Sequence, residues 1–145
     1  MLKRYTFWLW LAVVFLFLSG GIHSIGLFVN PSPADDTERQ LIDLMVNYKQ
    51  DLGAGFHRST MNLFTALSSC FTFLCFLGGL TIAFLLKKKA PAGILKGVVG
   101  IHWLIFAACF LVMLLLTFLV PIVLIGLILL FLTIGCLLIP KETAI

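Results

Sequence analysis

The chain has 145 residues, of which 61% are hydrophobic and only 11% are charged. A soluble domain carries about 25% charged residues, so too few polar side chains are present to cover a water-exposed surface, and a soluble globular protein is excluded. The formal net charge is +4. We attribute it to membrane topology and not to nucleic-acid binding, because most basic residues flank apolar stretches.

Four apolar stretches are long enough to cross a bilayer, which takes about 20 residues per helix. They lie at about 5–28, 59–86, 93–118 and 121–139. The segment at about 30–58 is polar, and the four stretches with this segment account for one integral membrane domain, 1–145. The sequence therefore predicts an all-α protein: a four-transmembrane-helix antiparallel bundle with an amphipathic helix in the outside loop between helices one and two.

The polar segment carries the signals of a helix start. Ser32 can act as the N-cap, and Pro33 suits the first helical position. Gly53 and Gly55 are predicted to end this helix. Its apolar residues recur at spacings of three and four, which is typical of a helix on a membrane surface or over the end of the bundle, or of a plain connecting helix; they are Leu41, Leu44, Met45, Tyr48 and Leu52.

The basic residues beside the spans are distributed unequally between the two sides of the membrane. One side, which the polar segment between the first two spans occupies, has only three basic residues, Arg39, Lys49 and Arg58, and it also carries acidic residues. The other side has seven basic residues. Since Lys and Arg accumulate in cytoplasmic segments, both termini are predicted to be cytoplasmic. The seven basic residues on that side are Lys3, Arg4, Lys87, Lys88, Lys89, Lys96 and Lys141.

Polar residues at membrane depth are the candidates for function, because each must be paired or face a wet cavity. The longest set follows one face of the second span at spacings of 4, 3, 4 and 3 residues. Small polar residues allow helices to approach and hydrogen-bond, so this stripe indicates either tight helix packing or a ligand-lined groove. Its members are Arg58, Asn62, Thr65, Ser69 and Thr72.

A second set lies near the outer end of the predicted bundle. His23 is close to the end of the first span, and His57 and Arg58 precede the second span. Asp51 could pair with Arg58 or with a protonated histidine. The set predicts a structural polar cluster or a binding site for a ligand or partner, and His23 and His57 are weak candidates for metal or haem ligation.

A third feature is His102, about ten residues into the third span and so near the middle of the bilayer. We expect its imidazole to donate a hydrogen bond to a serine or to a backbone carbonyl, with Ser68, Ser69 and Cys70 at similar depth. Close helix crossings are predicted at four glycines, Gly78, Gly79, Gly97 and Gly100.

No Asp or Glu lies within a predicted span, and no nucleotide-binding, metalloprotease or serine-hydrolase motif is present. The four cysteines all lie in apolar stretches without the spacing of metal ligands. We therefore expect a non-enzymatic protein, and we expect no cofactor.

Two sequence patterns resemble those of a known family. Gly20-Gly21-Ile22-His23 closes the first span, and Gly55-Phe56-His57-Arg58-Ser59 opens the second. They resemble Gly-x-x-His and Gly-Phe-x-Arg-Ser in an uncharacterised group of small bacterial inner-membrane proteins with four helices. Asn62 stands where that pattern has an aspartate. The resemblance implies the four-helix fold and a bacterial cytoplasmic membrane, and it implies no activity.

Taken together, the residues predict a membrane protein that binds a hydrophobic or anionic ligand, or a partner membrane protein. The expected partners are membrane lipids, a second copy of the chain or another membrane protein. Two alternatives stay open: a haem- or metal-binding redox protein that uses His23 and His57, and a structural subunit of a membrane complex. The predicted ligand- or partner-binding residues are His23, His57, Arg58, Asn62, Thr65 and Ser69.

Overall fold

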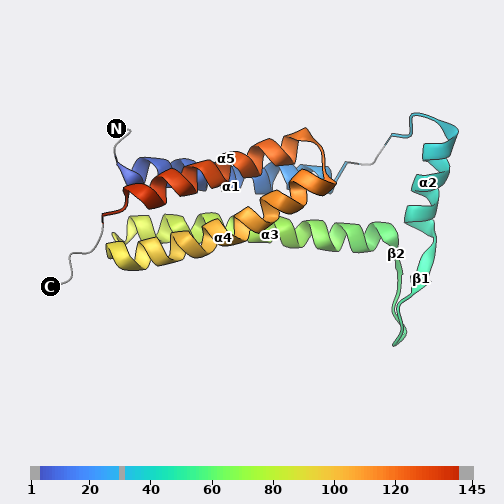
Figure 1. Ribbon diagram of the computed structural model, residues 1–145. Coiled ribbons are helices and arrows are strands. Elements are labelled where there is room, and N and C mark those ends of the chain that lie inside the picture. The colour runs from blue at the N-terminus through green and yellow to red at the C-terminus, as the bar shows by residue number, and fades with distance from the viewer. Residues whose placement is uncertain (1–3, 30–31, 141–145) are drawn as a thin grey trace. The chain divides into compact units, whose positions relative to one another are not determined.

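The computed structural model describes residues 4–29 and 32–140 (Figure 1). The helices in this part of the chain are α1 (Tyr5–Gly26), α2 (Asp36–Asn47), α3 (Thr60–Lys87), α4 (Ala92–Leu116) and α5 (Leu119–Leu138). Strands β1 (Lys49–Asp51) and β2 (His57–Ser59) form an antiparallel hairpin. The predictions that concern Lys3 and Lys141, and the first residues of the polar segment, fall outside the described residues.

Helices α1, α3, α4 and α5 are each long and apolar enough to cross a membrane. They have 22, 28, 25 and 20 residues, and a helix of about 20 residues spans the hydrocarbon core. The predicted set of four apolar helices is therefore confirmed, and it indicates an integral membrane protein.

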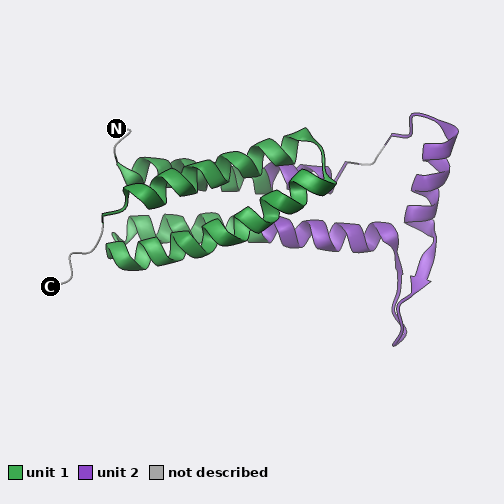
Figure 2. Ribbon diagram, in the orientation of Figure 1, with its two compact units in different colours: residues 1–20, 74–145 green, residues 21–73 purple. Residues whose placement is uncertain are grey.

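The chain divides into two compact units (Figure 2). Unit 1 comprises Met1–Gly20 and Leu74–Ile145, and unit 2 comprises Gly21–Phe73. Unit 1 therefore contains most of α1, the second half of α3, and all of α4 and α5. Unit 2 contains the end of α1, α2, the hairpin and the first half of α3.

The buried side chains of unit 1 lie three, four or seven residues apart along each helix, so each helix turns one apolar stripe inward. Aromatic rings add to the contact between α1 and α5, where Phe15 meets Phe131 edge-on at 5.2 Å between ring centroids. The core residues are Leu9, Ala12, Val13 and Leu16 of α1, Cys75 and Ile82 of α3, Leu95, Val99 and Phe106 of α4, Ile125, Ile128 and Leu132 of α5, and Ile139.

Glycines mark the close helix contacts of unit 1. A Cβ added to Gly135 would lie 2.5 Å from Leu9 Cδ2, and one added to Gly79 would lie 3.1 Å from a ring carbon of Phe17. Gly78 likewise faces α4. The predicted crossings at Gly78 and Gly79 are confirmed. The prediction is wrong for Gly97 and Gly100, where an added Cβ would meet no atom of residues 4–29 and 32–140 within 4 Å.

Helix α2 of unit 2 begins later than predicted. Its N-cap is Asp35, not Ser32, because the Asp35 carboxylate accepts a hydrogen bond of 2.8 Å from the Glu38 backbone N–H. The Glu38 carboxylate in turn accepts from the Ala34 N–H. This reciprocal arrangement resembles a capping box, which satisfies two N–H groups that a helix start otherwise leaves unpaired.

The end of α2 also differs from the prediction, because the helix ends at Asn47 and a hairpin follows. Gly53, Ala54 and Gly55 have φ of 82°, 50° and 80° and form the hairpin turn. Glycine adopts these left-handed angles without a steric penalty. The two glycines therefore serve the hairpin turn and do not end a helix.

Candidate functional site

The hairpin and a helix cap bring Arg58 and Asn62 to the start of α3. Ser59 is the N-cap: its Oγ accepts from the Asn62 backbone N–H at 3.3 Å. Asn62 Oδ1 accepts from the Ser59 backbone N–H at 3.2 Å and from Ser59 Oγ at 3.0 Å. This is a capping box with asparagine in place of the usual glutamate, and it fixes the side chain of Asn62 on the first turn.

The cap also decides which polar atoms of Asn62 are available to a ligand. A backbone N–H can only donate, so the Asn62 atom that accepts from it is the oxygen. The Nδ2 group, with its two N–H bonds, is the end of this exposed side chain that the cap does not use. Asn62 can therefore donate hydrogen bonds to a bound anion while it caps the helix.

Arg58 is exposed, and its partners lie in the two residues that precede it. One guanidinium nitrogen donates to the His57 carbonyl at 3.1 Å, and the group lies 5.7 Å from the centre of the Phe56 ring. Within residues 4–29 and 32–140, it forms no ion pair with a carboxylate. A guanidinium has five N–H donors, so most of them are available to an anion.

Asp51, which the sequence offers as a partner for Arg58, has another role. The strand register sets Asp51 opposite His57, and Gln50 opposite Arg58. The Asp51 carboxylate accepts from the Gly53 backbone N–H at 2.9 Å and so stabilises the hairpin turn. The positive charge of Arg58 is consequently left without a neutralising partner in the described chain.

A hollow of about 310 Å³ lies beside these two residues and is lined by Arg58, Asn62, Leu63 and Ala66. One side is polar, with the guanidinium and the amide, and the other is apolar. The sequence does not predict Leu63 and Ala66 as site residues, because nothing distinguishes them from the other apolar residues of the span. The signal that could have identified them is helical spacing: Leu63 lies four residues after Ser59, and Ala66 lies four residues after Asn62.

The apolar side of the hollow continues along α3. Leu63, Ala66, Cys70 and Phe73 follow at spacings of three and four, and all four are exposed. They form a continuous apolar stripe on the first half of the helix. The arrangement therefore joins a cationic end to an apolar track, which is the chemistry that an anionic amphiphile would match.

The other members of the predicted polar stripe take part in helix packing and internal hydrogen bonds. Ser69 Oγ donates to the Thr65 carbonyl at 2.8 Å, one turn back on the same helix. Thr72 is buried, and its hydroxyl accepts from Ser24 Oγ at 3.4 Å. The stripe is exposed at Asn62 and Thr65 and buried at Thr72, so its far end contacts the last turns of α1.

His23 and His57 occupy different places in unit 2. The His23 ring meets Phe71 edge-on at 5.0 Å between centroids, and its buried Nε2 has no hydrogen-bond partner in the described chain. His57 is exposed at the start of β2. Phe71 is eleven residues after Thr60 on α3, about 16 Å at 1.5 Å per residue. The predicted outer cluster of His23, His57 and Arg58 is therefore not assembled.

The same separation bears on the weak metal candidates. Across residues 4–29 and 32–140, no group of three or more His, Cys, Asp or Glu side chains is close enough to hold a metal ion. His23 of α1 contacts Phe71, whereas His57 of β2 precedes Thr60 at the start of α3, so the two histidines lie at different levels of that helix. The described residues thus offer no shared ligand set for the two histidines.

His102 donates from Nδ1 to the Val98 carbonyl at 2.8 Å, so the expectation of a backbone carbonyl partner is confirmed. The depth assigned to its neighbours is wrong: Gly78 and Thr81 lie beside His102, where Ser68, Ser69 and Cys70 were expected. When a short turn joins two antiparallel helices, residues at equal sequence distances from the turn lie at the same depth in the membrane. Gly78 and His102 are nine and ten residues from the ends of α3 and α4 that the turn connects.

Comparison of the chain with protein-family models, with curated proteins and with solved structures finds no match.

Proposed function

We propose that this protein binds an anionic amphiphile, with a membrane lipid as the ligand class, at the start of α3. The observation that carries the proposal is the hollow lined by Arg58, Asn62, Leu63 and Ala66. Arg58 and the Asn62 amide would donate to the anionic headgroup. The exposed apolar stripe along α3 would hold the hydrocarbon chain.

The length of α3 supports a location at the level of lipid headgroups. Its 28 residues extend about 42 Å, whereas the hydrocarbon core is about 30 Å thick. Lys87, Lys88 and Lys89 anchor the other end of the helix in the opposite interface. The excess of about 12 Å, or about eight residues, therefore falls in the first two turns, where Asn62, Leu63 and Ala66 lie.

The same proposal includes the arrangement in the membrane. The four apolar helices would form an antiparallel bundle in a bacterial cytoplasmic membrane, with both termini in the cytoplasm. The unequal distribution of Lys and Arg supports this orientation. Helix α2 would lie on the outer surface, because none of its residues is buried and Leu41 and Leu44 are 56% and 60% exposed. An interface is the environment that matches such an amphipathic helix.

The direct test is lipid retention by the full-length protein. The protein is released from a mild detergent that contains equal amounts of phosphatidylglycerol and phosphatidylcholine, and bound lipid is counted by native mass spectrometry. Wild-type protein should retain the anionic lipid preferentially. Arg58→Gln should reduce that preference about fivefold, as expected for the loss of one charge-assisted contact at a solvated site.

Two further variants separate specific binding from general charge and from helix capping. Arg39→Gln removes the same charge from an exposed position on α2 and should leave the preference unchanged. Asn62→Asp keeps an oxygen acceptor for the Ser59 N–H but replaces the amide donors with a negative charge. It should lower retention of phosphatidylglycerol without loosening the first turn of α3. Equal retention by Arg58→Gln and wild type would refute the proposed site.

A further inference from the structure

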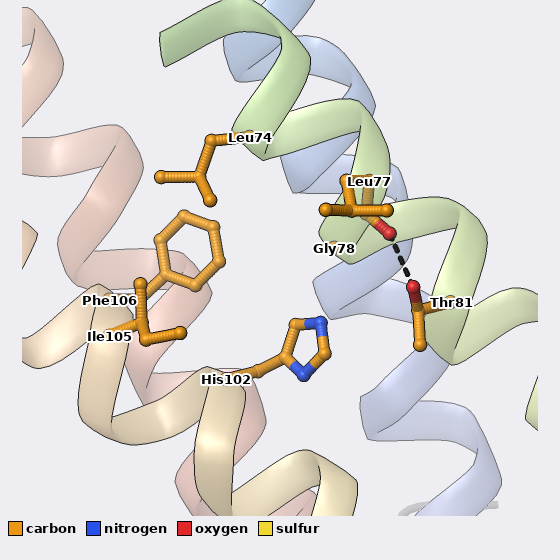
Figure 3. Close-up of a pocket in the computed structure, with 7 residues that line it drawn as sticks. All are labelled: Leu74, Leu77, Gly78, Thr81, His102, Ile105 and Phe106. Carbon is orange, nitrogen blue, oxygen red and sulfur yellow. Dashed lines mark hydrogen bonds between the residues drawn. The ribbon is translucent and has the colours of Figure 1, made fainter. Parts of the chain in front are cut away.

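A cavity of about 180 Å³ lies in unit 1 between α3 and α4 (Figure 3). Most of its wall is apolar, and two side chains bring polar atoms to it, His102 from α4 and Thr81 from α3. Figure 3 shows the His102 ring directed toward α3, beside Gly78. The lining residues are Leu74, Leu77, Gly78, Thr81, His102, Ile105 and Phe106.

The hydrogen bonds that His102 and Thr81 already make within the protein determine whether each can donate to a ligand or accept from it. His102 Nδ1 lies 2.8 Å from the Val98 carbonyl, and a carbonyl can only accept, so Nδ1 carries the proton. In a neutral imidazole Nε2 is then an acceptor. The Thr81 hydroxyl donates to the Leu77 carbonyl at 2.7 Å, so its proton is also committed. Both polar atoms can therefore accept a hydrogen bond from a ligand.

Gly78 brings α3 close to the imidazole edge. A Cβ at this position would lie 3.3 Å from His102 Cδ2 and 3.7 Å from Nε2. A larger residue than glycine would therefore crowd the side of the ring that carries the free acceptor. The absence of a side chain at Gly78 leaves Nε2 accessible from the cavity.

We propose that this cavity binds a neutral, ring-sized molecule that has one hydroxyl donor, such as a phenol. The volume of about 180 Å³ is close to the roughly 150 Å³ of an apolar protein cavity that accommodates benzene. The apolar walls match an aromatic ring, and the ligand hydroxyl donates to His102 Nε2. A molecule without a donor leaves that acceptor unsatisfied, which carries a cost inside an apolar environment.

The position of the cavity also fits a ligand that arrives through the lipid. His102 is ten residues from the start of α4, about 15 Å into the membrane. Leu77 and Ile105 on its rim are 63% and 42% exposed. The cavity is thus open at a level where hydrocarbon surrounds the protein, and an apolar phenol partitions into that layer. This site is separate from the hollow at Arg58, and its test does not depend on the proposed lipid binding.

The experiment compares phenol with anisole, which keeps the ring and the oxygen but has no donor. Both are titrated into the full-length protein in micelles, and the Ile105 methyl resonance reports occupancy by NMR. Phenol should saturate and should bind about fivefold more tightly than anisole, as one hydrogen bond predicts. In His102→Phe, which keeps an aromatic ring but has no nitrogen, the two probes should bind equally. Comparing this ratio between variants cancels the different partitioning of the probes into micelles.

Leu104→Phe is the matched control, because Leu104 is exposed on α4 and does not line the cavity. It should keep the preference for phenol. The nitrogen resonance of His102 Nε2 in wild-type protein gives a second reading, which does not require the His102→Phe variant to fold. Phenol should shift it in the direction of hydrogen bonding, and anisole should not. The same ratio of phenol affinity to anisole affinity in wild type and in His102→Phe, or an unmoved Nε2 resonance, would each overturn the proposal.

Discussion

Replacing Gly135 with alanine tests the close approach of α5 to α1 in unit 1. The new Cβ would lie 2.5 Å from Leu9 Cδ2 and 2.9 Å from Leu9 Cγ. Leu9 is 0% exposed, so its side chain has no open space into which it can rotate. The backbone nitrogen of Leu9 lies 3.6 Å from the same point. The methyl group must therefore force either the Leu9 side chain or the two helices apart.

The magnitude follows from two opposed effects. Alanine is about 1 kcal/mol more favourable than glycine in a helix interior, and overpacking a well-filled core costs about 1–3 kcal/mol. Gly100 lies inside α4, and its added Cβ has no neighbour within 4 Å in the part of the chain that the structure describes. Gly100→Ala therefore receives the first effect alone. The free energy of unfolding of Gly135→Ala should therefore be about 1–3 kcal/mol lower than that of Gly100→Ala.

Equilibrium unfolding of the full-length protein by SDS in mixed micelles, followed by circular dichroism, measures this difference. A double variant identifies the cause: in a Leu9→Ala background the obstructing side chain is gone, so Gly135→Ala should no longer destabilise the protein. Coupling between two residues in contact amounts to about 0.5–3 kcal/mol. If Gly135→Ala proves as stable as Gly100→Ala, or if Leu9→Ala does not relieve the penalty, the packing argument is refuted.

Two other contacts make predictions of smaller size. Ser59→Ala removes the N-cap of α3 and should lower the stability of this helix by about 1 kcal/mol. Amide hydrogen exchange should become faster in the first turn only. Unchanged exchange there would show that the cap does not hold this turn. Thr133→Val removes the acceptor of the 2.8 Å hydrogen bond from Trp103 Nε1, which joins α4 to α5. The substitution should lower the free energy of unfolding by about 0.6 kcal/mol, the average for such bonds in membranes. It should also shift the fluorescence maximum of Trp103, and a spectrum like that of wild type would argue against the bond.

The membrane helices follow from properties that each stretch of sequence carries by itself. The last helix is predicted at about 121–139 and observed at Leu119–Leu138, because the length and apolarity of a span depend on no distant residue. In the same way, the lysines that follow the apolar stretch predict the end of α3, and the proline before α4 predicts the start of that helix. Hydropathy alone was therefore sufficient to predict four helices.

The polar segment was harder to predict, because several local signals compete there. Ser32 and Asp35 are both good N-caps, and Asp35 is the one used because Glu38 completes a reciprocal pair with the preceding backbone. The early end of α2 depends on pairing between Lys49–Asp51 and His57–Ser59. Helix start and stop signals, read for one helix at a time, do not take into account the stabilisation that this strand pairing provides.

The residues of the two proposed sites were visible in the sequence only in part. Arg58, Asn62 and His102 attract notice because polar groups in or near a span need partners. Their partners, however, depend on how the helices cross, and that is decided by many weak contacts such as the one between Gly135 and Leu9. For this reason His23 lies against Phe71 and away from His57, and His102 faces Gly78 across a cavity. Sequence by itself determined which segments enter the membrane, whereas the tertiary structure decided which side chains meet there, because side-chain proximity depends on the depth and rotation of every helix at once.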